Sequence, residues 1–86
     1  DFTSVDKSIA SYVENATLTN TGKMLIGKKG VGIFSKDSDV TSSGDITLSK
    51  EAIAFNLDGT FTGRTLNFTS KITLTDEDNT ILTLKE

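Results

Sequence analysis

A repeat of 22 residues constrains this chain more than any other feature of its sequence. Ile9–Tyr12, Val31–Phe34 and Ile53–Asn56 each begin with a β-branched aliphatic residue followed by Ala or Gly, and they start 22 positions apart. A second string, Thr19–Ile26, matches Thr41–Leu48 at the same offset. A fixed period of this length is typical of repeat architectures, in which a unit buries its apolar face only by stacking on its neighbours.

Each copy contains three short strand-like segments separated by turn signals. In the first full copy the segments are residues 17–19, 24–26 and 31–34, and the turns between them contain Gly. Three strands and three turns in about 22 residues make one rung of a parallel β-helix. The sequence therefore predicts an all-β fold, a single parallel β-helix (solenoid) of about four rungs, at about residues 1–15, 16–37, 38–59 and 60–86.

Stacked rungs place equivalent residues on one another. Alternating apolar residues should point inward, and Thr, Ser, Lys and Asp should point outward. The predicted inward pairs are Leu18 on Val40, Ile26 on Leu48 and Ile33 on Phe55.

Small residues recur at the same offset and indicate two kinds of constraint. Gly32 and Ala54 should occupy equivalent crowded sites. Gly22 and Gly44 are interpreted as turn positions that need positive φ.

The N-terminal segment has a second interpretation. The spacing of an amphipathic helix is shared by Val5, Ile9, Tyr12, Val13 and Ala16. Thr3–Asp6 also resembles a capping box, so a helix over residues 4–15 followed by a β-meander is an alternative. We favour a rung at residues 9–12 because of the shared offset. A short capping helix over residues 3–8 would combine the two interpretations.

The last third of the chain departs from the repeat. Residues 62–68 and 72–74 are interpreted as a shortened copy, with offsets of about 20 and then 19. Residues 71–75 and 80–85 alternate in polarity, and they fit either a hairpin or two strands joined by a long corner. Because residues 60–86 are apolar where a terminal cap would be polar, we expect partners at this end. These would be flanking rungs of the same chain or other copies of it.

Composition excludes several classes of chemistry. The 86 residues include no His and no Cys, which excludes disulfides, thiolate metal sites and histidine-based catalysis. A net charge of −3 argues against a nucleic-acid partner. The 14 Thr and 9 Ser favour β-structure with many turns. No apolar run approaches the ~18–20 residues of a membrane span. The first residues lack a signal-peptide pattern, so a targeting segment would lie outside this sequence.

Candidate sites in the sequence each have a plainer interpretation. Asp76–Asn79 could bind Ca²⁺ and Asp37–Asp39 is a weaker version, but neither has a known calcium-loop spacing, so both are interpreted as solvated turns. Gly27–Gly30 could bind an anion, but it lacks the spacing and the helix of a phosphate-binding loop, so a turn with solvated lysines is the favoured interpretation. The sequons at residues 15–17 and 67–69 are chance matches in a Thr-rich chain.

Carboxylates and aromatic residues give no clear active site. The acids are scattered rather than paired as in glycoside hydrolases, at Asp37, Asp39, Asp45, Glu51 and Asp58. Core stacking is the expected role of Phe34, Phe55, Phe61 and Phe68, although they could line a ligand groove. We therefore predict a non-enzymatic protein with no catalytic, cofactor-binding or metal-binding residues and no cofactor.

Residues 19–34 resemble the repeats of autotransporter (type V secretion) passenger regions, most closely the fusobacterial adhesin type. The shared pattern is N-x-G-x-I-x-[IV]-G-x-x-[AGS]-[VI]-G-[IM]-[YF], with Met24 at the Ile position, and the resemblance covers about residues 9–59. It implies an extracellular β-helix at a bacterial cell surface, acting as a structural or adhesive shaft, with a host or bacterial receptor as a further partner. Such passengers are far longer than 86 residues.

Two other functions are compatible with the same sequence. The first is a self-assembling fibre subunit, stacking end to end through the open ends of the β-helix. The second is a carbohydrate-binding β-domain.

Overall fold

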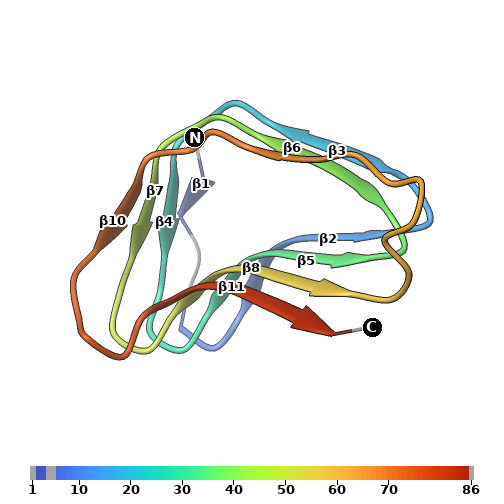
Figure 1. The fold of residues 1–86 in the computed structure, drawn as a ribbon. Coiled ribbons are helices and arrows are strands. Elements are labelled where there is room, and N and C mark those ends of the chain that lie inside the picture. The colour runs from blue at the N-terminus through green and yellow to red at the C-terminus, as the bar shows by residue number, and fades with distance from the viewer. Residues whose placement is uncertain (1, 4–5, 86) are drawn as a thin grey trace.

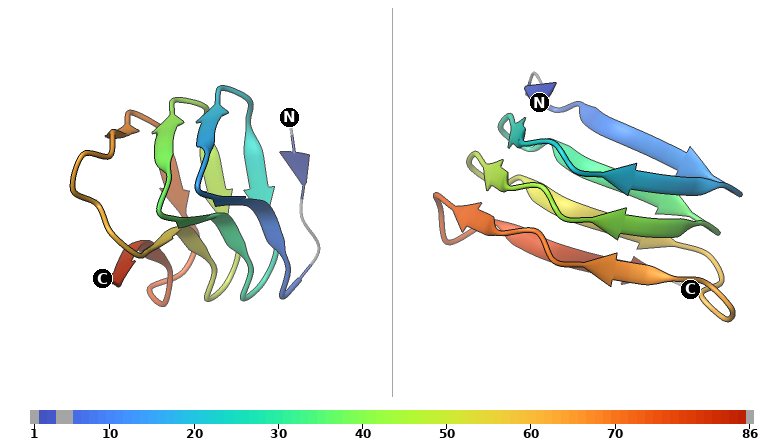
Figure 2. Two further views of the ribbon diagram at one scale, coloured as in Figure 1. Left: turned by 90° about the vertical axis from the view of Figure 1, so that its right-hand side faces the viewer. Right: turned by 90° about the horizontal axis from the view of Figure 1, so that it is seen from above.

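The computed structural model describes residues 2–3 and 6–85, which form a three-sided parallel β-solenoid (Figure 1). Its eleven strands are β1 (Phe2–Thr3), β2 (Ile9–Glu14), β3 (Thr17–Asn20), β4 (Met24–Ile26), β5 (Val31–Lys36), β6 (Asp39–Ser42), β7 (Ile46–Leu48), β8 (Ile53–Asp58), β9 (Leu66–Phe68), β10 (Ile72–Leu74) and β11 (Thr80–Lys85). Sheet A has the order β1-β4-β7-β10, sheet B the order β11-β8-β5-β2, and sheet C the order β3-β6-β9. Three turns are therefore followed by two further strands, stacked as Figure 2 shows.

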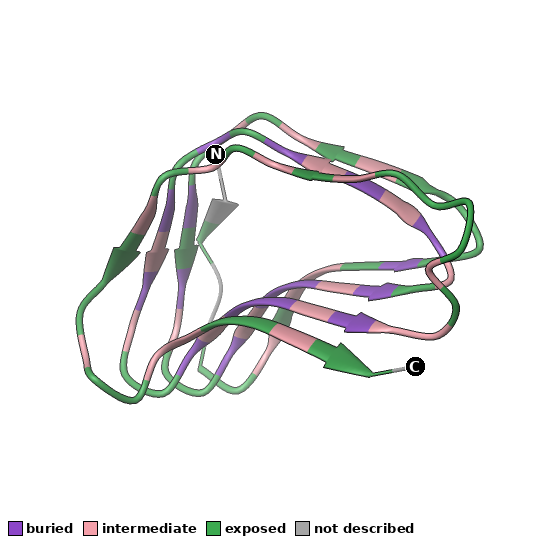
Figure 3. Ribbon diagram, viewed as in Figure 1, coloured by how far each residue is buried: buried purple, intermediate pink, exposed green. Residues whose placement is uncertain are grey.

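The predicted stacking of inward residues is confirmed. Leu18 pairs with Val40, Ile26 with Leu48, and Ile33 with Phe55, all in parallel register. These side chains belong to the core between the three sheets or pack against it. The buried segments lie mainly on the strands of the middle rungs (Figure 3). The core is a column of aliphatic residues running along the solenoid axis, and it holds each rung in place through its neighbours.

The helix over residues 4–15 is wrong. Residues 9–14 form β2, which pairs with β5 from Ile9 on Val31 to Glu14 on Lys36. Because side chains alternate along a strand, Val13 points into the core while Tyr12 is exposed on the outside. These two residues of the predicted amphipathic helix therefore lie on opposite faces. The shorter capping helix over residues 3–8 is also absent from the described residues of this segment. Thr3 belongs to β1, residues 6 and 7 form a turn, and residues 4 and 5 lie outside the described residues.

The last rung is longer than its predecessors, not shorter. Ile46 pairs with Ile72, 26 positions later, and Ile53 pairs with Thr80, 27 positions later. The extra residues form the loop over residues 59–65 and the corner over residues 75–79. The predicted offset of 19 matches Ile72 with Ile53, which lies in β8 of sheet B, whereas Ile72 belongs to sheet A. β10 and β11 belong to different sheets, so the C-terminal segments are joined by a corner and do not form a hairpin.

Glycine at residue 44 is required by close approach rather than by φ. Neither Gly22 nor Gly44 has positive φ, so that expectation is wrong. A Cβ at Gly44 would instead collide with the carbonyl oxygen of Gly22, one rung earlier. The crowding predicted at Gly32 is confirmed, since a Cβ there would lie 2.7 Å from the carbonyl oxygen of Ala54.

Left-handed backbone occurs at both ends of the sheet B strands. Two columns of stacked corner residues have positive φ: Lys7, Lys29 and Glu51 before the strands, and Asn15, Asp37 and Gly59 after them. Such residues turn the chain sharply from one sheet into the next, and Asn, Asp and Gly tolerate this conformation best. The same backbone therefore recurs at equivalent corners of successive rungs.

Candidate functional site

The acidic loops predicted as solvated turns use their polar groups within the fold. Asn79 accepts hydrogen bonds through Oδ1 from the backbone N–H of Thr75 and Asp76, and its Nδ2 donates to the carbonyl oxygen of Ser49 at 2.6 Å. Asp37 accepts from the N–H of Thr60 at 2.6 Å. Within residues 2–3 and 6–85, no three acidic side chains gather in a group able to hold a metal ion.

Polar side chains of three successive rungs are hydrogen-bonded to one another near the ends of the sheet C strands. Ser42, which is fully buried, accepts a hydrogen bond from Asn20 Nδ2 at 3.3 Å and shares one with Ser70 at 2.6 Å. Among the described side chains, none that is buried leaves a polar atom without a partner. The polar side chains in the described interior are therefore all hydrogen-bonded, as is usual for buried polar groups.

The phenylalanines divide between the lumen and the outer face. Phe55 stacks on Phe68 inside, with ring centroids 4.4 Å apart. Phe61, from the 59–65 loop, packs against the core. Phe34 is a correction to the core assignment: it points outward and stacks on Tyr12 at 5.3 Å. Desolvation and the Glu14 carboxylate, which accepts a hydrogen bond from the Tyr12 hydroxyl, raise the pKa of Tyr12.

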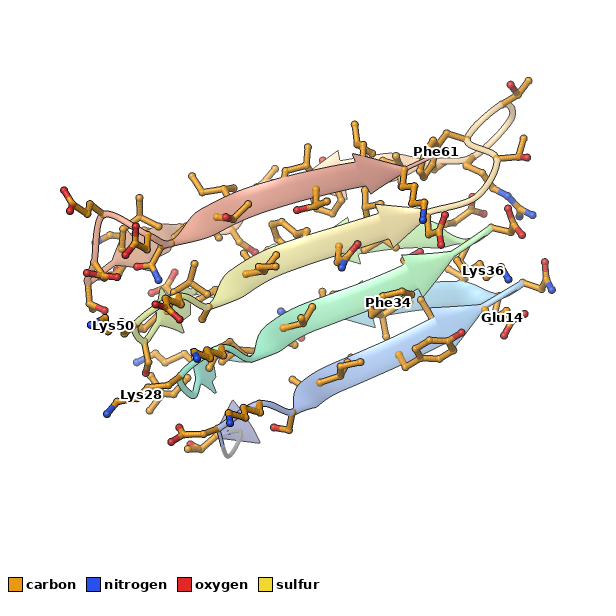
Figure 4. The ribbon with its side chains drawn as sticks, turned by 90° about the horizontal axis from the view of Figure 1, so that it is seen from below. Glu14, Lys28, Phe34, Lys36, Lys50 and Phe61 are labelled. Carbon is orange, nitrogen blue, oxygen red and sulfur yellow. The ribbon has the colours of Figure 1, made fainter. Side chains whose placement is uncertain are left out.

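Charged residues on the outer face form columns of alternating sign. At the ends of the sheet B strands the register stacks Glu14, Lys36, Asp58 and Lys85 in that order (Figure 4 labels the first two). Beside sheet A, the register that pairs Met24 with Ile46 and Ile46 with Ile72 stacks their preceding residues Lys23, Asp45 and Lys71. Opposite charges at cross-strand neighbours stabilise the register, and like charges there destabilise it.

Reversing one charge in the sheet B column should therefore weaken the fold in a salt-dependent way. The variant Lys36→Glu places a carboxylate between Glu14 and Asp58, and we expect it to cost about 1 kcal/mol of unfolding free energy at low salt. The cost should shrink in ~1 M salt, where exposed charges are screened. Urea denaturation at both salt concentrations measures this, and Lys36→Gln is the neutral control. A loss of unfolding free energy that does not change with salt would show that charge interactions along the column do not stabilise the fold.

One corner breaks the alternation. The basic corner, defined as Lys28, Lys29 and Lys50, stacks two like charges because Lys28 and Lys50 occupy equivalent positions of successive rungs (Figure 4). With Glu51, these residues line a hollow of about 210 Å³. Glu51 Oε2 lies 3.7 Å from Lys29 Nζ in an exposed ion pair, which contributes little to stability. The four lining side chains carry a net charge of +2.

No protein family, curated protein or solved structure matches this chain. Residues 2–3 and 6–85 contain no helix that is long and apolar enough to cross a membrane.

The basic corner is the feature that a linear reading of the sequence missed. Gly27–Gly30 is a turn, as predicted, but the turn alone shows only two lysines. The signal that could have found the third is the repeat itself, since Lys50 follows Lys28 by 22 positions.

Proposed function

We propose that this chain is a non-enzymatic segment of an elongated β-solenoid shaft at a bacterial cell surface, similar to an autotransporter passenger. The observation that carries the proposal is the state of the C-terminal end of the solenoid. There the inward positions remain apolar, yet nothing among the described residues covers them (Figure 3). A shaft that continues past this end would cover them.

Register identifies these exposed residues as core positions of a rung with an open side. Leu82 pairs with buried Phe55 and Leu84 with buried Leu57, but their own exposed fractions are 43% and 56%. Leu74 likewise pairs with the buried Leu48 and is half exposed. Burying a Leu side chain fully is worth about 1.5–3 kcal/mol. A further rung would therefore gain several kcal/mol by stacking here.

End-to-end stacking of separate copies is the second candidate, and the charge column favours it. If β2 of another copy paired with β11, its Glu14 would lie beside Lys85 and its Val13 beside Leu84, so the alternation of charge would continue. Sheet C argues against it. In a continuous solenoid, the strand that follows β11 would belong to sheet C and pair with β9, the last strand of that sheet. A copy that begins by pairing its β2 with β11 does not supply this strand, so the edge of β9 stays unpaired. A rung that also adds a strand to β9 fits the end better, which favours a continuous shaft.

Size and surface exposure of the polypeptide in its source cells test both candidates. Intact cells would be treated with protease, and an antibody against residues 1–86 would detect the remaining polypeptide. The shaft predicts a mass far above 9.2 kDa and loss of the signal from intact cells. A polypeptide of 9.2 kDa recovered in filaments would instead support the fibre. A protease-resistant signal, with a cytoplasmic protein as control, would contradict a surface location.

A further inference from the structure

The corners over residues 27–30 and 49–52 have the same backbone. In the first, the N–H of Gly30 donates to the carbonyl oxygen of Gly27 at 3.0 Å; in the second, Ala52 donates to Ser49 at 3.1 Å. The third residues, Lys29 and Glu51, have φ of 57° and 60°. The two corners are one structure repeated a rung apart, so a difference in their hydrogen bonding comes from side chains.

Such a difference exists at the second residue of each corner. The N–H of Lys28 donates to Oδ1 of Asp6, one rung earlier, at 2.9 Å. At the next corner Lys28 takes the place of Asp6, and the N–H of Lys50 has no acceptor among the described residues. Because the two corners have the same backbone, the N–H of Lys50 points to the position that corresponds to Asp6 Oδ1 at the preceding corner. Lys28, the residue that takes the place of Asp6 at this corner, lines the hollow of the basic corner together with Lys50.

Charge at this position points the same way. The two charge columns described above alternate in sign, whereas at this corner Lys28 stacks on Lys50 and Lys7 stacks on Lys29. A like-charged stack costs stability, and such departures from local rules are expected at functional sites. A free backbone donor among cationic side chains is the arrangement that binds oxyanions through charge-assisted hydrogen bonds.

We propose that the basic corner binds a single oxyanionic group of the size of sulfate or phosphate. One oxygen of the group accepts the hydrogen bond of the Lys50 N–H, in the place that Asp6 Oδ1 occupies for Lys28. The ammonium groups of Lys28, Lys29 and Lys50 neutralise its charge. Binding also weakens the competing ion pair between Lys29 and Glu51. The site does not depend on the shaft function, because it needs only two stacked corners.

Titration followed by NMR tests the site. Sodium sulfate and sodium phosphate would be added separately to ¹⁵N-labelled chain at constant ionic strength, balanced with chloride, and the backbone amide of Lys50 would be monitored. We expect a saturable shift of this amide with a midpoint of about 1–10 mM, as befits an exposed site with few contacts. The two titrations show which anion is the better ligand.

Lys28→Asp is the decisive variant, because it rebuilds the Asp6 arrangement one rung later. The new carboxylate should accept from the Lys50 N–H and weaken anion binding about tenfold or more. Lys85→Asp makes the same change of charge at the far end of sheet B and should leave the midpoint unchanged within about twofold. Lys50→Gln keeps the N–H and should weaken binding less than Lys28→Asp does. A Lys50 shift that is linear with both anions, or equal weakening by Lys28→Asp and Lys85→Asp, would overturn the proposal.

Discussion

Replacing Ile26 with Asp should unfold the chain, whereas the same replacement at its neighbour Leu25 should leave it folded. The two native side chains are isomers in the same strand, β4, and both changes introduce one carboxyl group. Ile26 is 1% exposed and stacks on Leu48 in the lumen, while Leu25 is 50% exposed and pairs with Thr47 on the outside. The pair therefore isolates the direction in which a side chain points.

Magnitudes decide the outcome for Ile26→Asp. A domain of this length is stable by about 4–13 kcal/mol at the usual stability per residue. Loss of the buried Ile costs about 2–5 kcal/mol, and a carboxylate in the apolar lumen adds several more unless it takes up a proton. Since the lumen column joins all rungs, the loss is not confined to one of them.

Far-UV circular dichroism and urea denaturation would check this pair of variants. We expect no cooperative transition for Ile26→Asp and a transition within about 1 kcal/mol of the native chain for Leu25→Asp. If both variants unfold alike, or neither does, the inward and outward assignments of β4 are wrong.

The repeat made the fold predictable, because its offset equals the number of residues per rung. Leu18, Ile26 and Ile33 could each be matched with its neighbour from the sequence alone. The same rule failed at the end of the chain, where insertions change the length of the rung. There, residues 72–74 repeat the Ile-Thr-Leu sequence of residues 46–48, with which they pair in sheet A, but at an offset of 26 that a fixed period of 22 does not match.

Side-chain direction was harder to predict for the aromatic residues. Phe34 was assigned to the core from its place in the repeat, but it lies next to the inward-facing Ile33 in β5, and strand alternation sends it outward to stack on Tyr12. The basic corner was missed for a related reason. Linear motifs describe neighbours along the chain, whereas in a solenoid the neighbours of Lys28 lie one rung away, at Asp6 and Lys50.

Replacing Gly44 with Ala should be among the most damaging single changes available outside the lumen. The added methyl group would meet the backbone carbonyl oxygen of Gly22, which cannot rotate aside as a side chain could. The two stacked corners would have to separate, although parallel strands in a sheet lie only ~4.8 Å apart. We expect a loss of about 3 kcal/mol or more, at the upper end of what overpacking costs.

Gly63→Ala separates this steric effect from the backbone preference of glycine. Gly63 has φ of +76°, but a Cβ there would meet no atom within 4 Å, so only the left-handed backbone is penalised. That penalty is about 1–2 kcal/mol. Urea denaturation of the two variants should therefore rank Gly44→Ala as clearly more destabilised. The opposite ranking would mean that positive φ matters more than contact between rungs, as the sequence pattern first suggested. The expected ranking would show that the spacing of the rungs, and not the local turn, selects glycine at residue 44.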